Sequence, residues 1–177
     1  MNTKNNMKKR TIFKGFNRAL PYKFPRLKRW KNDRITWSGT FSFDPETCAY
    51  DLGNEDQSDW NKLGGLCFGI LGIHKDCFRF VWRYNLKTKK MEIAAGMYCN
   101  ETRTFNRITA INLGDELTCT LEVTRNNKDL TINFLCSNGK SYTSTYTIKR
   151  NPKLIFSVGL YFGGNQKAPQ KMIIYEK

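Results

Sequence analysis

Residues 117–123 read Leu-Thr-Cys-Thr-Leu-Glu-Val, with an apolar side chain at every second position. The same alternation returns in residues 130–136, after a turn at Asn126-Asn127. A period of two places alternate side chains on opposite faces of a β-strand. The two stretches therefore predict antiparallel strands, each with one face in a core and the other toward solvent.

The pattern continues on both sides of this pair. Residues 35–43 alternate in the same way and end at Asp44-Pro45, and Asn138-Gly139 is a typical hairpin turn. No sustained helical period follows residue 35. Further strands are predicted at residues 63–73, 77–84, 91–98, 104–113, 142–148, 154–162 and 172–175. Short strands separated by turn signals about every 8–12 residues are typical of sandwiches and barrels, so we expect an all-β, two-sheet antiparallel jelly-roll sandwich over residues 35–177.

The positive charge is concentrated before this domain. Of the net charge of +15, residues 1–34 carry twelve Lys or Arg against one acid, whereas residues 35–177 carry eighteen against fourteen. A concentrated positive charge favours a polyanionic partner, so we interpret residues 1–34 as a basic, partly irregular N-terminal arm. Its partner would be an anionic surface, or nucleic acid bound without sequence preference. The candidate polyanion-binding residues are Lys8, Lys9, Arg10, Lys14, Arg18, Lys23, Arg26, Lys28, Arg29 and Lys31.

Two local features of the arm lead to expectations about its structure. Thr11 is a suitable N-cap for a short helix that runs to Leu20, although such a helix would need a surface on which to dock. Aromatic residues, among them Tyr22, Phe24 and Trp30, lie between the basic ones. They pack either on the sandwich or on another molecule, and the sequence favours neither alternative.

The six cysteines indicate a reducing environment. The sequence has no Cys-x-x-Cys pair, and Cys119 and Cys136 occupy apolar positions of predicted strands, where a free thiol acts as a small hydrophobe. The first ten residues are polar and basic, so we expect no secretion signal. No apolar run approaches the roughly 20 residues of a membrane-spanning helix, and we expect no transmembrane segment.

Three stretches carry a resemblance to a known superfamily. They are residues 37–41 (Trp-Ser-Gly-Thr-Phe), residues 78–82 (Phe-Arg-Phe-Val-Trp) and residues 160–165 (Leu-Tyr-Phe-Gly-Gly-Asn), the last followed by Pro169. Their order and spacing resemble those of the concanavalin A-like jelly rolls, the superfamily of lectins, glucanases and laminin-G-like domains. The resemblance covers residues 35–177 and implies the fold, whereas function depends on the site.

A second resemblance concerns the combination of a basic aromatic arm, a sandwich and unpaired cysteines. This combination is similar to that of auxiliary capsid or decoration proteins of crAss-like tailed phages. The resemblance implies a viral structural protein, located in the virion or in the host cytoplasm during assembly. Its partners would be other capsid proteins or an anionic surface.

Several catalytic and metal sites are poorly supported by the sequence. Glycoside hydrolysis needs two facing carboxyl groups, and the Glu-x-Asp-x-x-Glu string of jelly-roll glucanases is absent. His74, the one histidine, would be the candidate residue of a polysaccharide lyase, with Arg79 and Arg83 on the strand beside it. The Cys and His spacing fits no zinc site, and the acidic loop around Asp56 fits no EF-hand, so we expect no metal and no cofactor.

Aromatic residues beside polar ones are candidates for sugar binding, because a sugar ring packs on an aromatic face. A loop aromatic can equally cover the edge of a sandwich, and both interpretations remain open. The candidate glycan-binding residues are Trp60, Asn61, Tyr98, Asn100, Tyr161 and Asn165.

These observations give three hypotheses of function. The first is a non-enzymatic structural or interaction protein, associated with a virion and anchored by its arm to an anionic partner. The second is a carbohydrate-binding, lectin-like module. The third is a polysaccharide lyase that uses His74.

Overall fold

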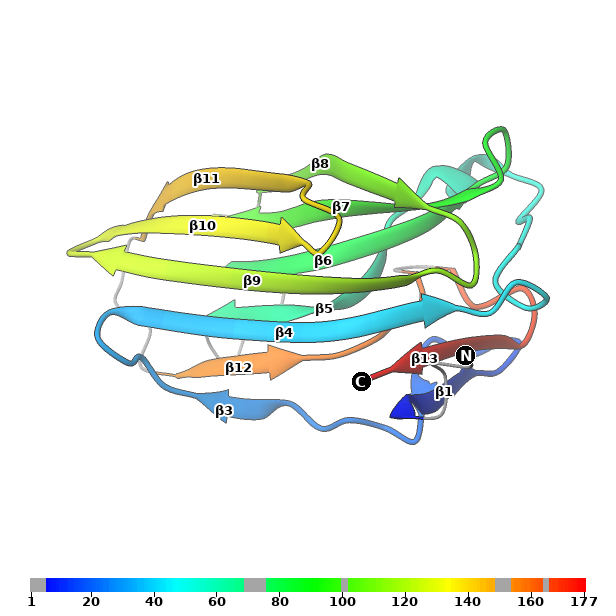
Figure 1. Cartoon of the computed structure of the whole chain (residues 1–177), viewed down its shortest axis with the longest axis horizontal. Helices are drawn as coiled ribbons and strands as arrows, with labels where there is room; N and C mark the ends of the chain where they lie inside the picture. The colour runs from blue at the N-terminus through cyan, green and yellow to red at the C-terminus, as the bar shows by residue number, and fades with distance from the viewer. Residues whose placement is uncertain (1–5, 69–75, 100–101, 149–153, 164–165) are drawn as a thin grey trace.

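The computed structural model describes residues 6–68, 76–99, 102–148, 154–163 and 166–177 (Figure 1). Ten strands follow the order that the alternation predicts, namely β4 (Arg34–Phe43), β5 (Asn61–Phe68), β6 (Asp76–Asn85), β7 (Lys90–Cys99), β8 (Thr102–Ile111), β9 (Glu116–Asn126), β10 (Asp129–Cys136), β11 (Ser141–Thr147), β12 (Ile155–Val158) and β13 (Met172–Glu176). Three more lie before residue 34, namely β1 (Lys8–Ile12), β2 (Ala19–Leu20) and β3 (Arg26–Lys28). A short 3₁₀ helix, η2 (Glu55–Ser58), precedes β5.

The strands form two antiparallel sheets. In the described residues, sheet A has the order β11-β10-β9-β4-β13-β1-β2 and sheet B the order β3-β12-β5-β6-β7-β8. Figure 1 shows β4, β9, β10 and β11 in front of the strands of sheet B. The expected all-β two-sheet sandwich is therefore confirmed. Among the described residues, no helix has the length and apolar character needed to span a membrane.

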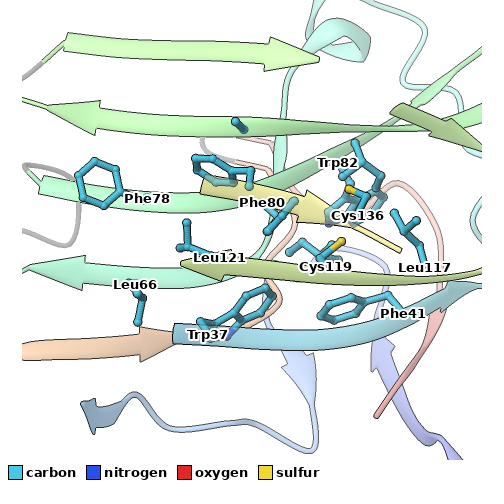
Figure 2. Close-up of a cluster of buried hydrophobic side chains, with 14 of the residues drawn as sticks. Trp37, Phe41, Leu66, Phe78, Phe80, Trp82, Leu117, Cys119, Leu121 and Cys136 are labelled. Atoms are coloured by element: carbon cyan, nitrogen blue, oxygen red, sulfur yellow. The ribbon is translucent and has the colours of Figure 1, made fainter. Parts of the chain in front are cut away.

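The core lies between the two sheets. The inward side chains of β6 meet those of β4, β9 and β10, and Figure 2 shows this aromatic layer. Phe80 of β6 packs edge-on against Phe134 of β10, with ring centroids 5.1 Å apart. The ring centroids of Trp82 and Phe43 are 5.2 Å apart. Such pairs stabilise a fold by about 0.5–1.5 kcal/mol beyond the burial of their area.

Sheet B is buried on both faces at its centre. Residues 61–68 of β5 are buried throughout, as the apolar, glycine-rich stretch predicts. Its outer face is covered by the chain itself, because Lys62 and Arg18 both form β-bridges with Tyr161.

The strand pairing of the N-terminal segment does not agree with the expected domain boundary between residues 34 and 35. β1 pairs along its whole length with β13, from Lys8 opposite Glu176 to Ile12 opposite Met172. β3 pairs with β12 and completes the edge of sheet B. Ile12 is fully buried in the core. The N-terminal residues are therefore part of the sandwich, because the edges of β13 and β12 supply backbone partners that a free arm lacks.

The expected helix from Thr11 to Leu20 is wrong. Thr11 lies in β1, and its Cα is paired with that of Leu20 in β2. A ten-residue helix that contains Gly15 is marginal alone, whereas strand pairing gives the same residues long-range hydrogen bonds. Gly15 has a φ of +79°, a conformation that suits the turn between the two strands and ends any helix.

Candidate functional site

A cavity of about 410 Å³ lies between the N-terminal segment and the outer face of sheet B. Its lining comes from three parts of the chain: residues 10–25, the outer side chains of β5 to β8, and residues 158–161 with Glu176. The residues that line it are Arg10, Arg18, Ala19, Pro21, Tyr22, Lys23, Pro25, Lys62, Arg79, Tyr98, Arg103, Val158, Gly159, Leu160, Tyr161 and Glu176.

Strand alternation places the sheet residues of this cavity. Phe78, Phe80 and Trp82 face the core, so Arg79 points to the other side of β6. Arg79 is paired with Gly96 of β7, and Tyr98 of β7 is paired with Arg103 of β8. These side chains form a cationic and aromatic floor.

The cavity carries a large excess of positive charge. Its lining includes six Lys or Arg side chains and one carboxylate, that of Glu176. Glu176 is already engaged, since Oε2 lies 2.9 Å from Nε of Arg10 and Oε1 lies 2.6 Å from Nζ of Lys23. The remaining lining therefore favours an anion.

Lys62 is a buried cation at this site. Only 8% of its surface is exposed, its Nζ donates a hydrogen bond to the Gly163 carbonyl, and it lies 5.3 Å from the ring centroid of Tyr161. Burial, together with the nearby charges of Arg79 and Arg103, lowers the pKa of Lys62 to about 8. An anion in the cavity would relieve this repulsion and stabilise the charged form.

Tyr98 lies between two guanidinium groups. The Arg79 guanidinium is 5.9 Å from its ring centroid, and that of Arg103 is 5.4 Å away. Burial raises the pKa of Tyr98, although the two arginines act in the opposite direction. The phenol therefore keeps its proton at neutral pH and can act as a hydrogen-bond donor.

A second cluster lies further along the same face, outside the cavity lining. The Arg83 guanidinium is 4.3 Å from the Trp60 ring, which stacks on Phe105 at 6.2 Å. The buried carboxylate of Glu92 accepts hydrogen bonds from Arg83 at 2.8 Å and from Arg107 at 2.8 Å. Here both arginines have a carboxylate partner within the protein.

The structure separates the residues that the sequence grouped as one basic arm. Arg10, Arg18 and Lys23 line the main cavity, and Arg26 and Lys28 line a smaller one of about 160 Å³ beside Trp37. The other five basic residues are exposed and line neither cavity. They are Lys8, Lys9, Lys14, Arg29 and Lys31.

The candidate glycan residues also divide. Tyr98 and Tyr161 line the cavity, whereas Trp60 belongs to the Arg83 cluster. Asn61 is buried, and its side chain bonds the Gly163 backbone and the Tyr50 hydroxyl, so it supports the fold of this region. Asn100 and Asn165 lie outside the described residues, as does His74.

Of the six Lys and Arg residues that line the cavity, the sequence analysis did not predict three as site residues: Lys62, Arg79 and Arg103. The alternation of β6 predicts that Arg79 and Arg83 lie on the same face of the strand, opposite its aromatic side chains. Lys62 and Arg103 gave no comparable signal, because each belongs to a different strand. No cluster of three potential metal ligands (His, Cys, Asp or Glu) occurs within the described ranges.

Comparison with known proteins supports the fold. No protein-family model and no curated protein sequence matches the chain. Among solved structures, an alginate lyase from Klebsiella pneumoniae is similar with a TM-score of 0.53 and 13% identity, over 80% of this chain and 56% of that one. A functionally unknown protein from Saccharomyces cerevisiae has a TM-score of 0.49 and 10% identity over 99% and 90% of the two chains. Peanut lectin has a TM-score of 0.42 and 13% identity over 96% and 84%.

These likenesses concern architecture. The chain spans little more than half of the length of the Klebsiella lyase, and the identity is far below the level at which an activity could be transferred. The fold that the lyase and this chain share is the two-sheet antiparallel jelly-roll sandwich that the sequence predicts.

Proposed function

We propose that this chain is a carbohydrate-binding protein that holds an anionic glycan in the cavity between the N-terminal segment and sheet B. The observation that carries the proposal is the convergence of six cationic side chains with Tyr98 and Tyr161 around one cavity of about 410 Å³. Guanidinium groups bind carboxylates and sulfates through charge-assisted hydrogen bonds. The volume is within the usual range of about 300–1,000 Å³ for small-ligand sites.

The alginate lyase from Klebsiella pneumoniae supports the same class of ligand, because it is by name an enzyme that acts on a polysaccharide. Arg18 and Tyr161, which come from segments far apart in sequence, form a β-bridge beside the cavity. The N-terminal residues thus form one wall of the site, to which Arg10, Arg18 and Lys23 contribute positive charge.

The proposal is for binding without catalysis. The phenol of Tyr98 is protonated at neutral pH, and Lys62 is hydrogen-bonded to a backbone carbonyl, so neither is a ready base. A lyase is the second candidate, because a cationic site near a tyrosine can also hold a uronate for β-elimination. Ultraviolet absorbance of an unsaturated uronate, formed from alginate or polygalacturonate, separates lyase activity from binding.

A virion-associated role is the proposal that loses support. It depended on an arm that the sandwich does not need, whereas β1 and β3 complete the two sheets. The charge that the arm would present to another virion protein is partly directed into the cavity. Assembly onto a capsid thus has no separate anchoring element among the described residues.

The test is calorimetric titration with matched acidic and neutral oligosaccharides. We expect binding to the acidic set, and a loss of about tenfold in affinity for Arg103→Gln, the equivalent of ~1.4 kcal/mol for a charge-assisted hydrogen bond. Arg107→Gln is the matched control, since Arg107 lies on the same strand but outside the cavity. Equal affinity for neutral and acidic sugars, or an equal loss in both variants, would contradict the proposal.

A further inference from the structure

Two pairs of cysteines lie directly opposite each other on neighbouring antiparallel strands. Cys67 of β5 is paired with Cys77 of β6, and Cys119 of β9 is paired with Cys136 of β10. Directly paired residues have Cα atoms about 4.5–5.5 Å apart, a separation that a disulfide can bridge. The side chains of all four cysteines are buried.

The surroundings of the two pairs differ. The Arg79 guanidinium donates from Nε to Sγ of Cys77 at 2.6 Å and from Nη2 to Sγ of Cys67 at 3.0 Å. Only 5% of the surface of Arg79 is exposed, so its charge is removed from water. A buried cation is stabilised by a negative partner, and a thiolate is a far stronger acceptor than a neutral thiol.

The second pair provides an internal comparison. Cys119 and Cys136 face the apolar core between the sheets, among residues such as Leu117 and Leu121 (Figure 2). Within the described parts of the chain, no Lys or Arg contacts either sulfur. Strand pairing is thus common to both cysteine pairs, and the buried guanidinium is the feature that distinguishes them.

We propose that Cys67 and Cys77 form a redox-active thiol pair in which Arg79 stabilises a thiolate, and that hydroperoxides convert the pair to a cross-strand disulfide. The hydrogen bond with Cys77 and the charge of Arg79 lower the pKa of Cys67 to about 7 against the effect of burial. The reactive form of a cysteine is its thiolate, so a substantial fraction is available at neutral pH.

The pair lies directly beneath the cavity. Cys67 and Cys77 pack with Tyr98 and Val158, and these two residues line the cavity together with Arg79. A small solute in the cavity is therefore separated from the sulfurs by a single layer of side chains. Hydrogen peroxide is small enough to cross such a layer during ordinary side-chain motion.

The chemistry balances with peroxide as oxidant. The Cys67 thiolate attacks one peroxide oxygen, the O–O bond breaks, and hydroxide leaves and takes a proton from solvent, so that Cys67 becomes a sulfenic acid. Sγ of Cys77 then attacks the sulfenic sulfur, the S–O bond breaks, and the hydroxyl leaves as water with the Cys77 proton. Two thiols lose two electrons, and one peroxide is reduced to two waters.

The experiment treats the full-length reduced protein with hydrogen peroxide and follows each pair by alkylation and peptide mass spectrometry. We expect the Cys67–Cys77 disulfide to form at least tenfold faster than a Cys119–Cys136 disulfide. Cys77→Ser is expected to leave a sulfenic acid on Cys67 that dimedone traps, whereas the matched Cys136→Ser gives no adduct on Cys119. Equal rates for the two pairs would overturn the proposal.

Arg79→Met tests the source of the reactivity, with folding checked by circular dichroism. We expect the rate of the Cys67–Cys77 pair to fall to that of the core pair. If this variant does not fold, the dependence of the wild-type rate on pH gives the same information. The groups that face Cys67 are Cys77, Arg79 and Tyr98, with Lys62 and Arg103 elsewhere in the cavity. A rate that begins to rise only above about pH 8.5, the range of an ordinary thiol, would contradict a stabilised thiolate.

Discussion

Arg10 of β1 and Glu176 of β13 form a buried ion pair at which the first and last strands of the described chain meet. Nε of Arg10 lies 2.9 Å from Oε2 of Glu176, and 6% and 7% of their surfaces are exposed. Since Lys23 reaches the other carboxylate oxygen, one acid is shared by two cations of the N-terminal segment. This relationship makes the N-terminal residues a structural component of the sandwich and a wall of the cavity at once.

Removing one partner of this pair should therefore destabilise the fold. We expect Arg10→Met to lower the free energy of unfolding by about 3 kcal/mol, because it leaves the Glu176 carboxylate with less compensation in a buried position. Lys9→Met is the control on the same strand; Lys9 is exposed, so its change should stay within about 0.5 kcal/mol. Urea unfolding followed by tryptophan fluorescence measures both, and equal stabilities would show that the Arg10–Glu176 pair does not stabilise the fold.

The part of the fold that the sequence predicts is the part with long, regular alternation. Residues 116–126 of β9 alternate buried and partly exposed side chains over most of the strand, and this pattern alone places them in a sheet. β1 has five residues, three of them Lys or Arg, and pairs with a strand about 160 residues away. Nothing local distinguishes such a strand from a basic tail, so the boundary at residue 34 was wrong.

The cavity was harder to predict than the fold because its residues come from several separate segments. Tyr98 and Tyr161 were candidates for their aromatic rings, whereas Arg79 was noted only for its stripe with Arg83. Lys62 follows an aromatic and an amide residue in a polar stretch, and only its β-bridge to Tyr161 reveals that it is enclosed. Convergence of this kind depends on sheet order and crossovers, which periodicity does not determine.

The charge on Lys62 should make anion binding depend on pH. Its pKa of about 8 lies below the ordinary value for lysine, so Lys62 is charged below pH 8 and becomes neutral as the pH rises through this value. We expect affinity for an acidic oligosaccharide to decrease between about pH 7 and pH 9. In Lys62→Met the affinity should be lower at pH 7 and this decrease should be absent. Titrations at constant ionic strength measure the effect, and an unchanged profile in Lys62→Met would assign the pH dependence to another group.

The two aromatic candidates should behave differently in glycan binding. Tyr161 lines the cavity, so Tyr161→Ala removes a contact face and is expected to weaken binding by about tenfold, the equivalent of ~1.4 kcal/mol. Trp60 stacks with Phe105 and Arg83 outside the cavity, and Trp60→Ala should leave the affinity within about twofold. Titration of both variants with the same acidic oligosaccharide compares them. The reverse order of effects would move the site to the Trp60 cluster.

Glu92 should stabilise the fold in a manner that depends on pH. Burial by itself would raise its pKa, but hydrogen bonds from Arg83, Asn85 and Arg107 outweigh burial and lower the pKa below 4.5. The charged form is thus favoured in the folded state, so its contribution to stability is present above about pH 4.5 and is lost as the pH falls through the lower, folded value.

We expect Glu92→Gln to lower the free energy of unfolding by about 2 kcal/mol at pH 7, a value typical of lost hydrogen bonds to a charged group. The difference from the wild type should shrink below pH 4, where Glu92 takes up a proton. Glu116→Gln serves as the control, because Glu116 is exposed at the start of β9. Urea unfolding at a series of pH values provides the measurement. A difference that is constant from pH 3 to pH 7 would assign the effect to packing, because only an ionised carboxylate gains from its two arginines.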